Sequence, residues 1–468
     1  AIPTLSFILT SLCDHPHLRR LCLRGHVGDL TGLDTLLLSD TSKITELEIH
    51  RAYGGSPIIG LTHVLHTLAR RPTLTKLGLR HCGHGLDEAR LLRMALCKLP
   101  NLQTLLLSGG TLGSAGLAGL APALYLNMSI KVLGISENGL NDRESAEILR
   151  DILRSNKTIT TLDLAGNRFG ITAGAVELIA DGLGSNSTLL TIDLTGCALG
   201  DDGVSILAQG LGSRNTTLQK LTLDMNNIRS TGVGVLLETM EQSSKSITDL
   251  ELRFNTIGNR GASLLARSLG NNALPNLTRL SLSNCGFSDD GFIALISALE
   301  ENKSLLHLDL RYNDFSERAF LALAESLPEI KVLQQVDLTW GPGLGSATPL
   351  LLAGLRKNTS LFRFHVTNGA PSSVPPTPEH TARCAGGWMQ EMERLGYRNR
   401  FLSLIRAPKE RLPPRGVWSS ALARAATLYD VIFEVLRSKP NLVPSEDTEG
   451  KEAARDTGVP RKRKCCDE

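Results

Sequence analysis

The residue types that most often carry chemistry are present in this sequence, but they lack catalytic spacing. Close histidine pairs occur three times, at His15 and His17, His63 and His66, and His81 and His84. No third metal ligand recurs at a fixed distance from these pairs, and the nine cysteines include no CxxC pair. The sequence also lacks a phosphate-binding loop, a nucleophile elbow and a dinucleotide fingerprint. We therefore expect no catalytic residue, no metal site and no cofactor, and we predict that the protein is not an enzyme.

The composition predicts a folded chain that is too long for one compact core. The 468 residues are 41% hydrophobic and 21% charged, which is typical of folded proteins rather than disordered ones. No run approaches the roughly 20 apolar residues of a transmembrane helix. Cysteines without disulfide-rich spacing favour a reducing compartment, so we expect a cytoplasmic protein. The chain starts at Ala1 without a basic leader, so upstream truncation or processing stays an open alternative.

One short segment, Leu-x-x-Leu-x-Leu, repeats thirteen times along the chain. It starts at Leu18, Ile44, Leu74, Leu102, Ile130, Ile159, Leu189, Leu218, Ile247, Leu277, Leu305, Leu333 and Leu361. The intervals lie between 26 and 30 residues, a period found in leucine-rich repeats and outside the ankyrin, TPR and WD40 lengths. The elements that position any functional side chain are therefore short strands separated by outer helices.

An asparagine or cysteine follows the repeated segment, three residues after its last leucine. The clearest examples are Asn138, Asn167, Cys197, Asn226, Asn255, Cys285 and Asn313. An asparagine there can satisfy backbone groups of adjacent coils, and a cysteine fills the same volume as a small buried hydrophobe. We predict a ladder of structural side chains rather than reactive thiols. Ala52 and Gly341 replace the ladder residue in the second and twelfth units.

The rest of each unit predicts a helix. Gly174 to Leu183 and Gly203 to Leu211 carry apolar residues on one helical face. Glycines recur near the helix starts, where neighbouring coils are expected to approach closely: Gly116, Gly174, Gly203, Gly232, Gly261 and Gly291.

The complete pattern resembles the leucine-rich repeats of the ribonuclease-inhibitor type, as in Leu223 to Ile228 and Leu310 to Phe315. The resemblance covers about residues 5–367. It implies an α/β solenoid, a horseshoe with a parallel concave β-sheet and convex helices, followed by a small helical C-terminal module. It fixes the fold and leaves the partner open.

Strand alternation sends the third, fifth and seventh residues of each repeat to the concave face. The fifth position forms a polar column: Glu48, Asp163, Asp193, Thr222, Glu251, Ser281, Asp309 and Asp337. Cations share this face at Lys220, Arg253, Arg279 and Arg311. A solvated mixed-charge sheet and a partner-binding surface are both open interpretations.

The eighth position of the repeat changes character along the chain. It is glycine in earlier units (Gly109, Gly166 and Gly196) and large in later ones (Met225, Phe254, Tyr312 and Trp340). Rings beside carboxylates and arginines are typical of binding hot spots. We predict a partner-binding site made by Glu251, Arg253, Phe254, Asp309, Arg311, Tyr312, Asp337 and Trp340. Packing of these rings against one another, closing the last coils, is the structural alternative.

Seven Asn-x-Ser/Thr sequons suggest glycosylation at first sight, but their period favours structure. They begin at Asn127, Asn156, Asn186, Asn215, Asn276, Asn302 and Asn358. Nearly all fall in the turn between a helix and the next strand, where asparagine and serine bond to the backbone. We interpret them as turn residues.

The sequence changes after the repeats. Residues 368–382 form a Pro-rich linker, residues 383–440 a basic helical module with a net charge of +6, and residues 441–468 a disordered tail. The module either caps the solenoid or binds a partner. It resembles the C-terminal module of uncharacterised leucine-rich-repeat proteins of unicellular algae, on the string from Glu393 to Leu402, Trp418, and Asp430 to Arg437. Arg461 to Lys464 suit nuclear import as an alternative location. The last two residues depart from a prenylation box, so we do not expect lipidation at Cys465 or Cys466.

The sequence therefore predicts a non-catalytic scaffold that binds a protein partner on the concave face and rim of the later repeats. A regulator or activator of small GTPases is the alternative, because the activator of the nuclear-transport GTPase has a similar repeat type, although its tail is markedly acidic and this tail is mixed. We do not expect nucleic-acid binding, since residues 1–382 carry a net charge of −2.

Overall fold

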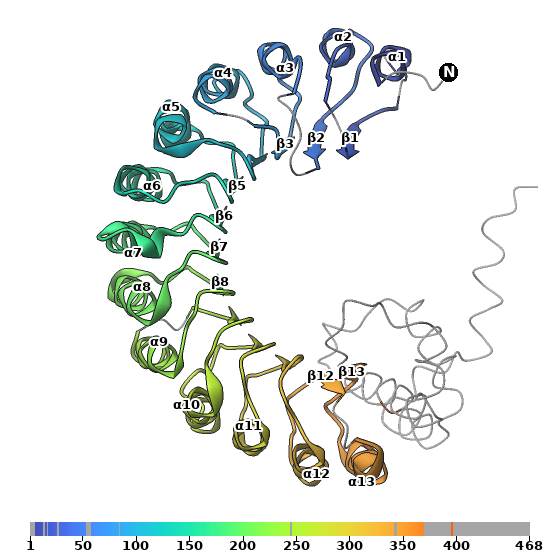
Figure 1. The fold of residues 1–468 in the computed structure, drawn as a ribbon, viewed down its shortest axis with the longest axis vertical. Coiled ribbons are helices and arrows are strands. Elements are labelled where there is room, and N and C mark those ends of the chain that lie inside the picture. Colours follow the sequence, from blue (N-terminus) through green and yellow to red (C-terminus); the bar gives the residue numbers. More distant parts are fainter. Residues whose placement is uncertain are drawn as a thin grey trace, which may run out of the picture.

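The computed structural model describes residues 5–12, 15, 17–25, 28–52, 58–83, 85–243, 246–340, 344–368 and 395. The predicted linker, helical module and tail lie outside these residues, apart from Asn368 and Leu395. Figure 1 shows the described part as a horseshoe, with strands lining the inner curve and helices the outer one.

Thirteen parallel strands form one sheet in strict chain order, β1 to β13. Their bounds are β1 (Arg20–Gly25), β2 (Glu46–Arg51), β3 (Lys76–Arg80), β4 (Thr104–Leu106), β5 (Val132–Gly134), β6 (Thr161–Asp163), β7 (Thr191–Asp193), β8 (Lys220–Thr222), β9 (Asp249–Glu251), β10 (Arg279–Ser281), β11 (His307–Asp309), β12 (Gln335–Trp340) and β13 (Arg363–Asn368). Each strand pairs only with its sequence neighbours, which is the arrangement expected of a solenoid.

A helix covers the sheet in every unit. The helices are α1 (Leu5–Ser11), α2 (Leu33–Leu38), α3 (Leu61–Leu68), α4 (Leu86–Leu96), α5 (Gly113–Leu126), α6 (Arg143–Ser155), α7 (Ala175–Ser185), α8 (Gly200–Arg214), α9 (Ser230–Gln242), α10 (Gly258–Gly270), α11 (Asp289–Glu301), α12 (Glu317–Ser326) and α13 (Leu344–Lys357), with one short 3-10 turn, η1 (Phe169–Ile171). The sequence prediction for α7 placed its start one residue early, because Gly174 is the cap that precedes the helix, with φ of 78°.

The repeated leucines form the core between sheet and helices, as predicted. In the seventh unit, Leu189, Ile192 and Leu194 are fully buried. The helix apolar face meets them from the other side through residues such as Ile179 and Leu183. Burial of a side chain of this size contributes about 1.5–3 kcal/mol relative to exposure. Every coil therefore depends on its neighbours for a core.

The predicted asparagine ladder is confirmed in the hydrogen bonds around Asn255. Its Nδ2 donates to the carbonyl oxygens of Leu223, at 3.0 Å, and Leu252, at 2.9 Å. Its Oδ1 accepts from the backbone N–H groups of Asn226 and Ile228, both at 3.0 Å. One side chain thus satisfies backbone groups of two adjacent coils.

The sequon asparagines form a second ladder on the opposite side of each strand. Asn186 donates from Nδ2 to the Leu153 carbonyl at 2.7 Å and accepts at Oδ1 from the N–H groups of Thr188 and Leu189, at 2.9 and 2.7 Å. Five of the seven are buried: Asn156, Asn186, Asn215, Asn302 and Asn358. A buried amide engaged in this way cannot accept a glycan, so the structural interpretation is confirmed for these five. Asn127 is half-buried and Asn276 exposed.

A glycine near the helix start allows the close approach that the sequence predicted. A Cβ built on Gly232 lies only 3.0 Å from the Cα of Asp201 in the preceding coil. Any larger residue would push the two coils apart.

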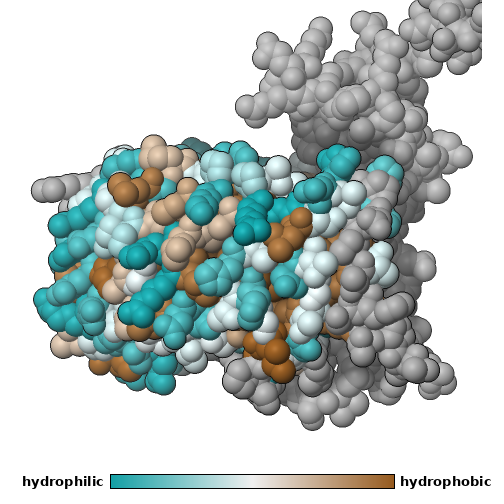
Figure 2. All heavy atoms as spheres, turned by 90° about the horizontal axis from the view of Figure 1, so that it is seen from above, coloured by the Kyte–Doolittle hydropathy of each residue, from teal (hydrophilic) through white to brown (hydrophobic). Residues whose placement is uncertain are grey.

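Across the described helices, none has the length and apolar character needed to span a membrane. Polar and apolar side chains are interspersed on the face shown in Figure 2.

Candidate functional site

The polar column predicted for the concave face is present. Strand register stacks Asp163 beside Asp193, and Ser281 between Glu251 and Asp309. Asp309 in turn pairs with Asp337 of β12. Because neighbouring strands lie about 4.8 Å apart, these side chains form one continuous polar surface across β6 to β12.

The cations on this face pair with its carboxylates instead of standing free. Arg253 donates from Nε to Asp224 at 2.9 Å and also contacts Glu251 through Nη2. Lys220 reaches the same Glu251 from β8. The later repeats therefore carry a cross-strand network of alternating charges, and its groups are held before any partner arrives.

A second arginine and its carboxylate repeat this arrangement two strands further on. Arg311 donates to Asp309 from Nε at 2.9 Å and from Nη2 at 2.8 Å. Burial alone would raise the pKa of Asp309, but the Arg311 hydrogen bonds outweigh it and hold that pKa below its ordinary value. Asp309 is therefore ionised at neutral pH.

The earlier part of the column differs, because its carboxylates face each other. Burial raises the pKa of Asp163, and neighbouring Asp193 raises it further, while a hydrogen bond from the Ala165 N–H opposes both effects. Asp193 accepts from Thr195 instead of a cation, at 2.6 Å from the hydroxyl. Asp163 and Asp193 therefore repel each other in this part of the column.

Two shallow hollows follow the concave face. One, of about 190 Å³, lies over β8 to β12 and includes Glu251, Arg253, Asp309 and Asp337 among its lining residues. The other, of about 360 Å³, lies over β6 to β9 and includes Asp163. Both are open and polar, which suits contact with a protein surface better than enclosure of a small ligand.

The eighth position of the repeat is a turn with left-handed backbone, a feature the sequence alone did not reveal. We call its members the left-handed row: His81, Gly109, Glu137, Gly166, Gly196, Met225, Phe254, Asn284 and Tyr312, with φ between 52° and 74°. Glycine adopts this conformation without cost, whereas other L-residues pay roughly 1–2 kcal/mol. The earlier repeats use glycine three times in this row, and the later repeats use none.

The large side chains of the left-handed row remain open to solvent. Their exposed fractions are 53% for Met225, 45% for Phe254 and 54% for Tyr312. Among the described ring pairs, contacts involve Phe292 with Phe315 and Phe320 in the core, and His15 with His17. Phe254 and Tyr312 do not pack against each other, because Asn284 separates them in the row. Packing of Tyr312 against Trp340 stays an open alternative, since the Trp340 side chain lies outside the described structure.

Trp340 departs from the expected equivalence with the other rings. Although it occupies the eighth position, it is the last residue of β12 and pairs in register with Asn368. The orientation of the Trp340 side chain lies outside the described structure.

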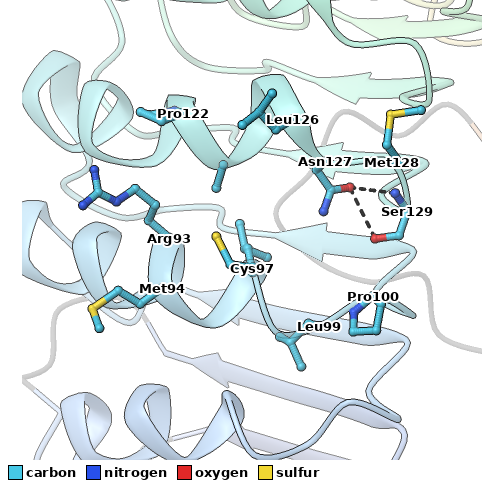
Figure 3. Close-up of a pocket in the computed structure, with 12 residues that line it drawn as sticks. Arg93, Met94, Cys97, Leu99, Pro100, Pro122, Leu126, Asn127, Met128 and Ser129 are labelled. Atoms are coloured by element: carbon cyan, nitrogen blue, oxygen red, sulfur yellow. Dashed lines mark hydrogen bonds between the residues drawn. The ribbon is translucent and has the colours of Figure 1, made fainter.

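A third hollow, on the helical side, was missed by the sequence reasoning. It has a volume of about 770 Å³ and lies between α4 and α5. Figure 3 shows Met94 and Cys97 on one side and Pro122 and Leu126 on the other. Leu126 is 83% exposed and Met94 59%. The repeat pattern does not mark this site, because its lining residues come from the C-terminal ends of α4 and α5 and from the turns that follow them.

The three cysteines of the ladder are not reactive thiols. Burial raises the pKa of Cys82, Cys197 and Cys285 to about 12 in each case. Cys285 donates to the Leu252 carbonyl at 3.1 Å, in the place of a ladder asparagine. The structural interpretation of these cysteines is confirmed.

One cluster in the described chain brings metal-ligating side chains close together, and it was not predicted from the sequence. Cys22, Glu48 and His50 each offer a donor atom within 4.8 Å of the others. The signal was available, since these residues occupy the fifth and seventh positions of adjacent repeats. The histidine pairs considered from the sequence do not form such a group within the described residues.

Comparisons with known proteins agree with the architecture. A family model described as "Leucine Rich repeat" matches residues 155–176, 185–208, 214–237, 243–266, 273–295 and 301–324. The chain is 30% identical over 302 residues to bovine NACHT, LRR and PYD domains-containing protein 3, covering 64% of this chain and 29% of that protein. It is 25% identical over 243 residues to mouse ribonuclease inhibitor, covering 51% of this chain and 46% of the inhibitor. The matched parts therefore span less than half the length of these relatives.

A solved structure titled "Crystal structure of Rad7 and Elc1 complex in yeast" is also similar, at 18% identity and a TM-score of 0.43, covering 79% of this chain and 85% of that one. Leucine-rich-repeat proteins typically mediate contacts between proteins. The thirteen-stranded parallel sheet, the asparagine ladders and the matched relatives together identify this chain as a leucine-rich-repeat protein of the ribonuclease-inhibitor-like type.

Proposed function

We propose that the protein is a non-catalytic scaffold that binds a protein partner on the concave face and rim of its later repeats. The contact residues of this proposal are Glu251, Arg253, Phe254, Asp309, Arg311, Tyr312, Asp337 and Trp340. A cytoplasmic location belongs to the same proposal, in keeping with the unbridged cysteines of the described chain.

The left-handed row carries the proposal. Phe254 and Tyr312 occupy a backbone conformation that costs free energy for any residue but glycine, and about half of each residue's surface stays exposed to solvent. Gly166 and Gly196 occupy the same eighth position of the repeat in earlier units, so the fold does not require an aromatic ring at this position. Exposed rings held in strained positions are expected where a partner supplies the missing burial.

The charge network supports the proposal in a different way. Arg253 and Arg311 are already paired, so a partner does not gain two free cations. The partner instead contacts polar side chains of the concave face that are already held by ion pairs. These side chains lose little conformational freedom on binding, which lowers the entropic cost of association. Specificity then comes from a partner surface that complements the charges of the concave face, and affinity comes from burial of the Phe254 and Tyr312 rings.

The named relatives are consistent with this arrangement. A ribonuclease inhibitor is, by its name, a protein that acts on another protein, and it shares this repeat type. Carried over to this chain, the analogy supports protein binding and leaves the partner's identity open.

Site-specific photocrosslinking tests the proposal. Asn284 lies exposed between Phe254 and Tyr312 in the left-handed row, so a photoreactive residue at position 284 should crosslink the partner in cells. The same residue at position 126, in the hollow between α4 and α5, is the matched control. Crosslinking at 126 and not at 284 would show that the partner binds the helical side.

If the crosslinked partner is a small GTPase, the protein could be the GTPase regulator that is the alternative function. Multiple-turnover GTP hydrolysis with and without the protein then separates a scaffold, which leaves the rate unchanged, from an activator, which raises it.

A further inference from the structure

The first two strands bring three different metal-donor groups together on the concave face. Cys22 of β1 pairs in register with Glu48 of β2, and Arg24 of β1 pairs with His50. Glu48 and His50 are two residues apart, so both point to the same side of the sheet. The donor atoms of Cys22, Glu48 and His50 lie within 4.8 Å of one another.

The donor set has the composition that zinc prefers. Thiolate sulfur, imidazole nitrogen and carboxylate oxygen bind Zn²⁺ at about 2.0–2.3 Å, and tetrahedral geometry then separates the donors by roughly 3.4 Å. The His50 Nε2 to Glu48 Oε2 distance is 2.8 Å. Admitting an ion requires these two side chains to move apart by about half an ångström, a change within rotamer freedom because His50 is only half-buried.

Neighbouring residues already hold two of the three ligands in place. Lys76 of β3 contacts Oε1 of Glu48 at 2.6 Å, which leaves Oε2 for His50. Arg24 donates from Nε to the Cys22 sulfur at 3.3 Å. Hydrogen bonds from neighbouring side chains orient a ligand and restrict its movement.

Glycine at position 78 leaves room on the third strand. Gly78 pairs in register with Glu48, and a Cβ there would lie 3.2 Å from the Glu48 Cγ. The carboxylate is buried, with its side chain 11% exposed, while Cys22 is exposed. The cluster therefore has a closed floor and a side open to solvent.

We propose that Cys22, Glu48 and His50 bind one Zn²⁺ ion, with a water molecule or a partner group as the fourth ligand. The ion links β1 to β2 at the N-terminal edge, where the sheet has no preceding described strand to pair with. Its position at the opposite end of the sheet from Phe254 and Tyr312 makes it independent of the proposed rim site.

The alternative is an ion-pair cluster without a metal, in which His50 and Lys76 simply neutralise Glu48. Cobalt distinguishes the two, because Co²⁺ replaces Zn²⁺ in such sites and a thiolate ligand produces a strong charge-transfer absorption. Titration of the reduced full-length protein with Co²⁺ should produce this absorption at one equivalent, together with the visible bands of tetrahedral cobalt. Zn²⁺ should then remove both.

Variants decide which residues are responsible. Cys22→Ser should abolish the charge-transfer band, and His50→Ala should weaken Co²⁺ affinity at least tenfold while the circular dichroism spectrum is retained. Cys97→Ser, at an exposed cysteine elsewhere, and the Cys465→Ser/Cys466→Ser double variant should leave the titration unchanged.

The proposal is overturned if the wild-type protein shows no charge-transfer band, or if the band persists in Cys22→Ser. Loss of the band in the Cys465→Ser/Cys466→Ser variant would likewise overturn it by placing the thiolate ligand in the tail. Retention of full affinity in His50→Ala would exclude the three-residue site.

Discussion

Arg253 binds Asp224 of the preceding repeat twice, from its backbone N–H to Oδ1 at 2.7 Å and from its Nε to Oδ2 at 2.9 Å. The pair joins β8 and β9 beyond their last paired residues. It fixes the guanidinium at the centre of the proposed partner-binding surface, where Glu251 completes its contacts.

Replacing Arg253 by methionine should destabilise the protein. Asp224 is buried, with 7% exposure, and loses its cation in this variant. Leaving a buried carboxylate unpaired costs several kcal/mol, and partial exposure of Arg253 reduces the cost here to about 2 kcal/mol. Chemical denaturation measures the change. The double variant with Asp224→Asn should recover part of the loss, and no recovery would contradict the role assigned to the pair.

Replacing Phe254 by glycine should stabilise the protein. Glycine relieves the left-handed backbone at this position, although it adds freedom to the unfolded chain, so the expected net gain is about 0.5–1 kcal/mol. The control is Gly196→Ala in the same row, which should lose about 1 kcal/mol. A destabilised Phe254→Gly variant would mean that the ring contributes to the fold instead of being reserved for a partner.

Asn255→Ala should be among the most damaging single changes in the later repeats. It leaves two carbonyl oxygens and two N–H groups without their partner, at roughly 1–3 kcal/mol for each group that water cannot reach. We expect a loss of about 3 kcal/mol or more by urea denaturation. Asn255→Cys should cost less, because Cys285 occupies the equivalent place in the next repeat and donates to the Leu252 carbonyl. Equal losses would refute the idea that the ladder acts through hydrogen bonds.

The ladder cysteines predict a dependence of stability on alkaline pH. A pKa raised to about 12 for Cys82, Cys197 and Cys285 means that the folded protein keeps these thiols protonated. Their contribution to stability is complete below the ordinary cysteine pKa of about 8.5 and is lost as the pH rises toward 12.

Alkylation provides the measurement. At pH 8, iodoacetamide should modify exposed Cys22 and Cys97 in the native protein and spare the three ladder thiols until the protein unfolds. Rapid native labelling of Cys197 would contradict the assignment, since that residue is fully buried.

The sequence predicted the repeats, the sheet and the asparagine ladder because one period sets them all. Each ladder asparagine occurs at a fixed distance from the last leucine, so local spacing alone places Asn226 and Asn255 in adjacent coils. The polar column followed from strand alternation for the same reason.

Features that depend on backbone conformation or on convex packing were not predictable in this way. The left-handed φ of Phe254 cannot be predicted from the pattern of residue types alone. The glycines at the same position in earlier repeats are consistent with a left-handed backbone there. Trp340 matches the pattern of residue types but remains in its strand, β12. The cluster of Cys22 with Glu48 and His50, in contrast, could have been found from the sequence, because these residues occupy the fifth and seventh positions of adjacent repeats.

The most direct test of the account is the affinity of the crosslinked partner for the Phe254→Gly/Tyr312→Gly double variant, measured beside the wild type. We expect a loss of at least roughly 2 kcal/mol of binding free energy, or about thirtyfold in Kd, in a variant at least as stable as the wild type. A Met94→Ser/Leu126→Ser variant should bind normally. Unchanged affinity of the double variant, or loss of binding in the Met94/Leu126 control, would contradict a partner site on the rim of the later repeats.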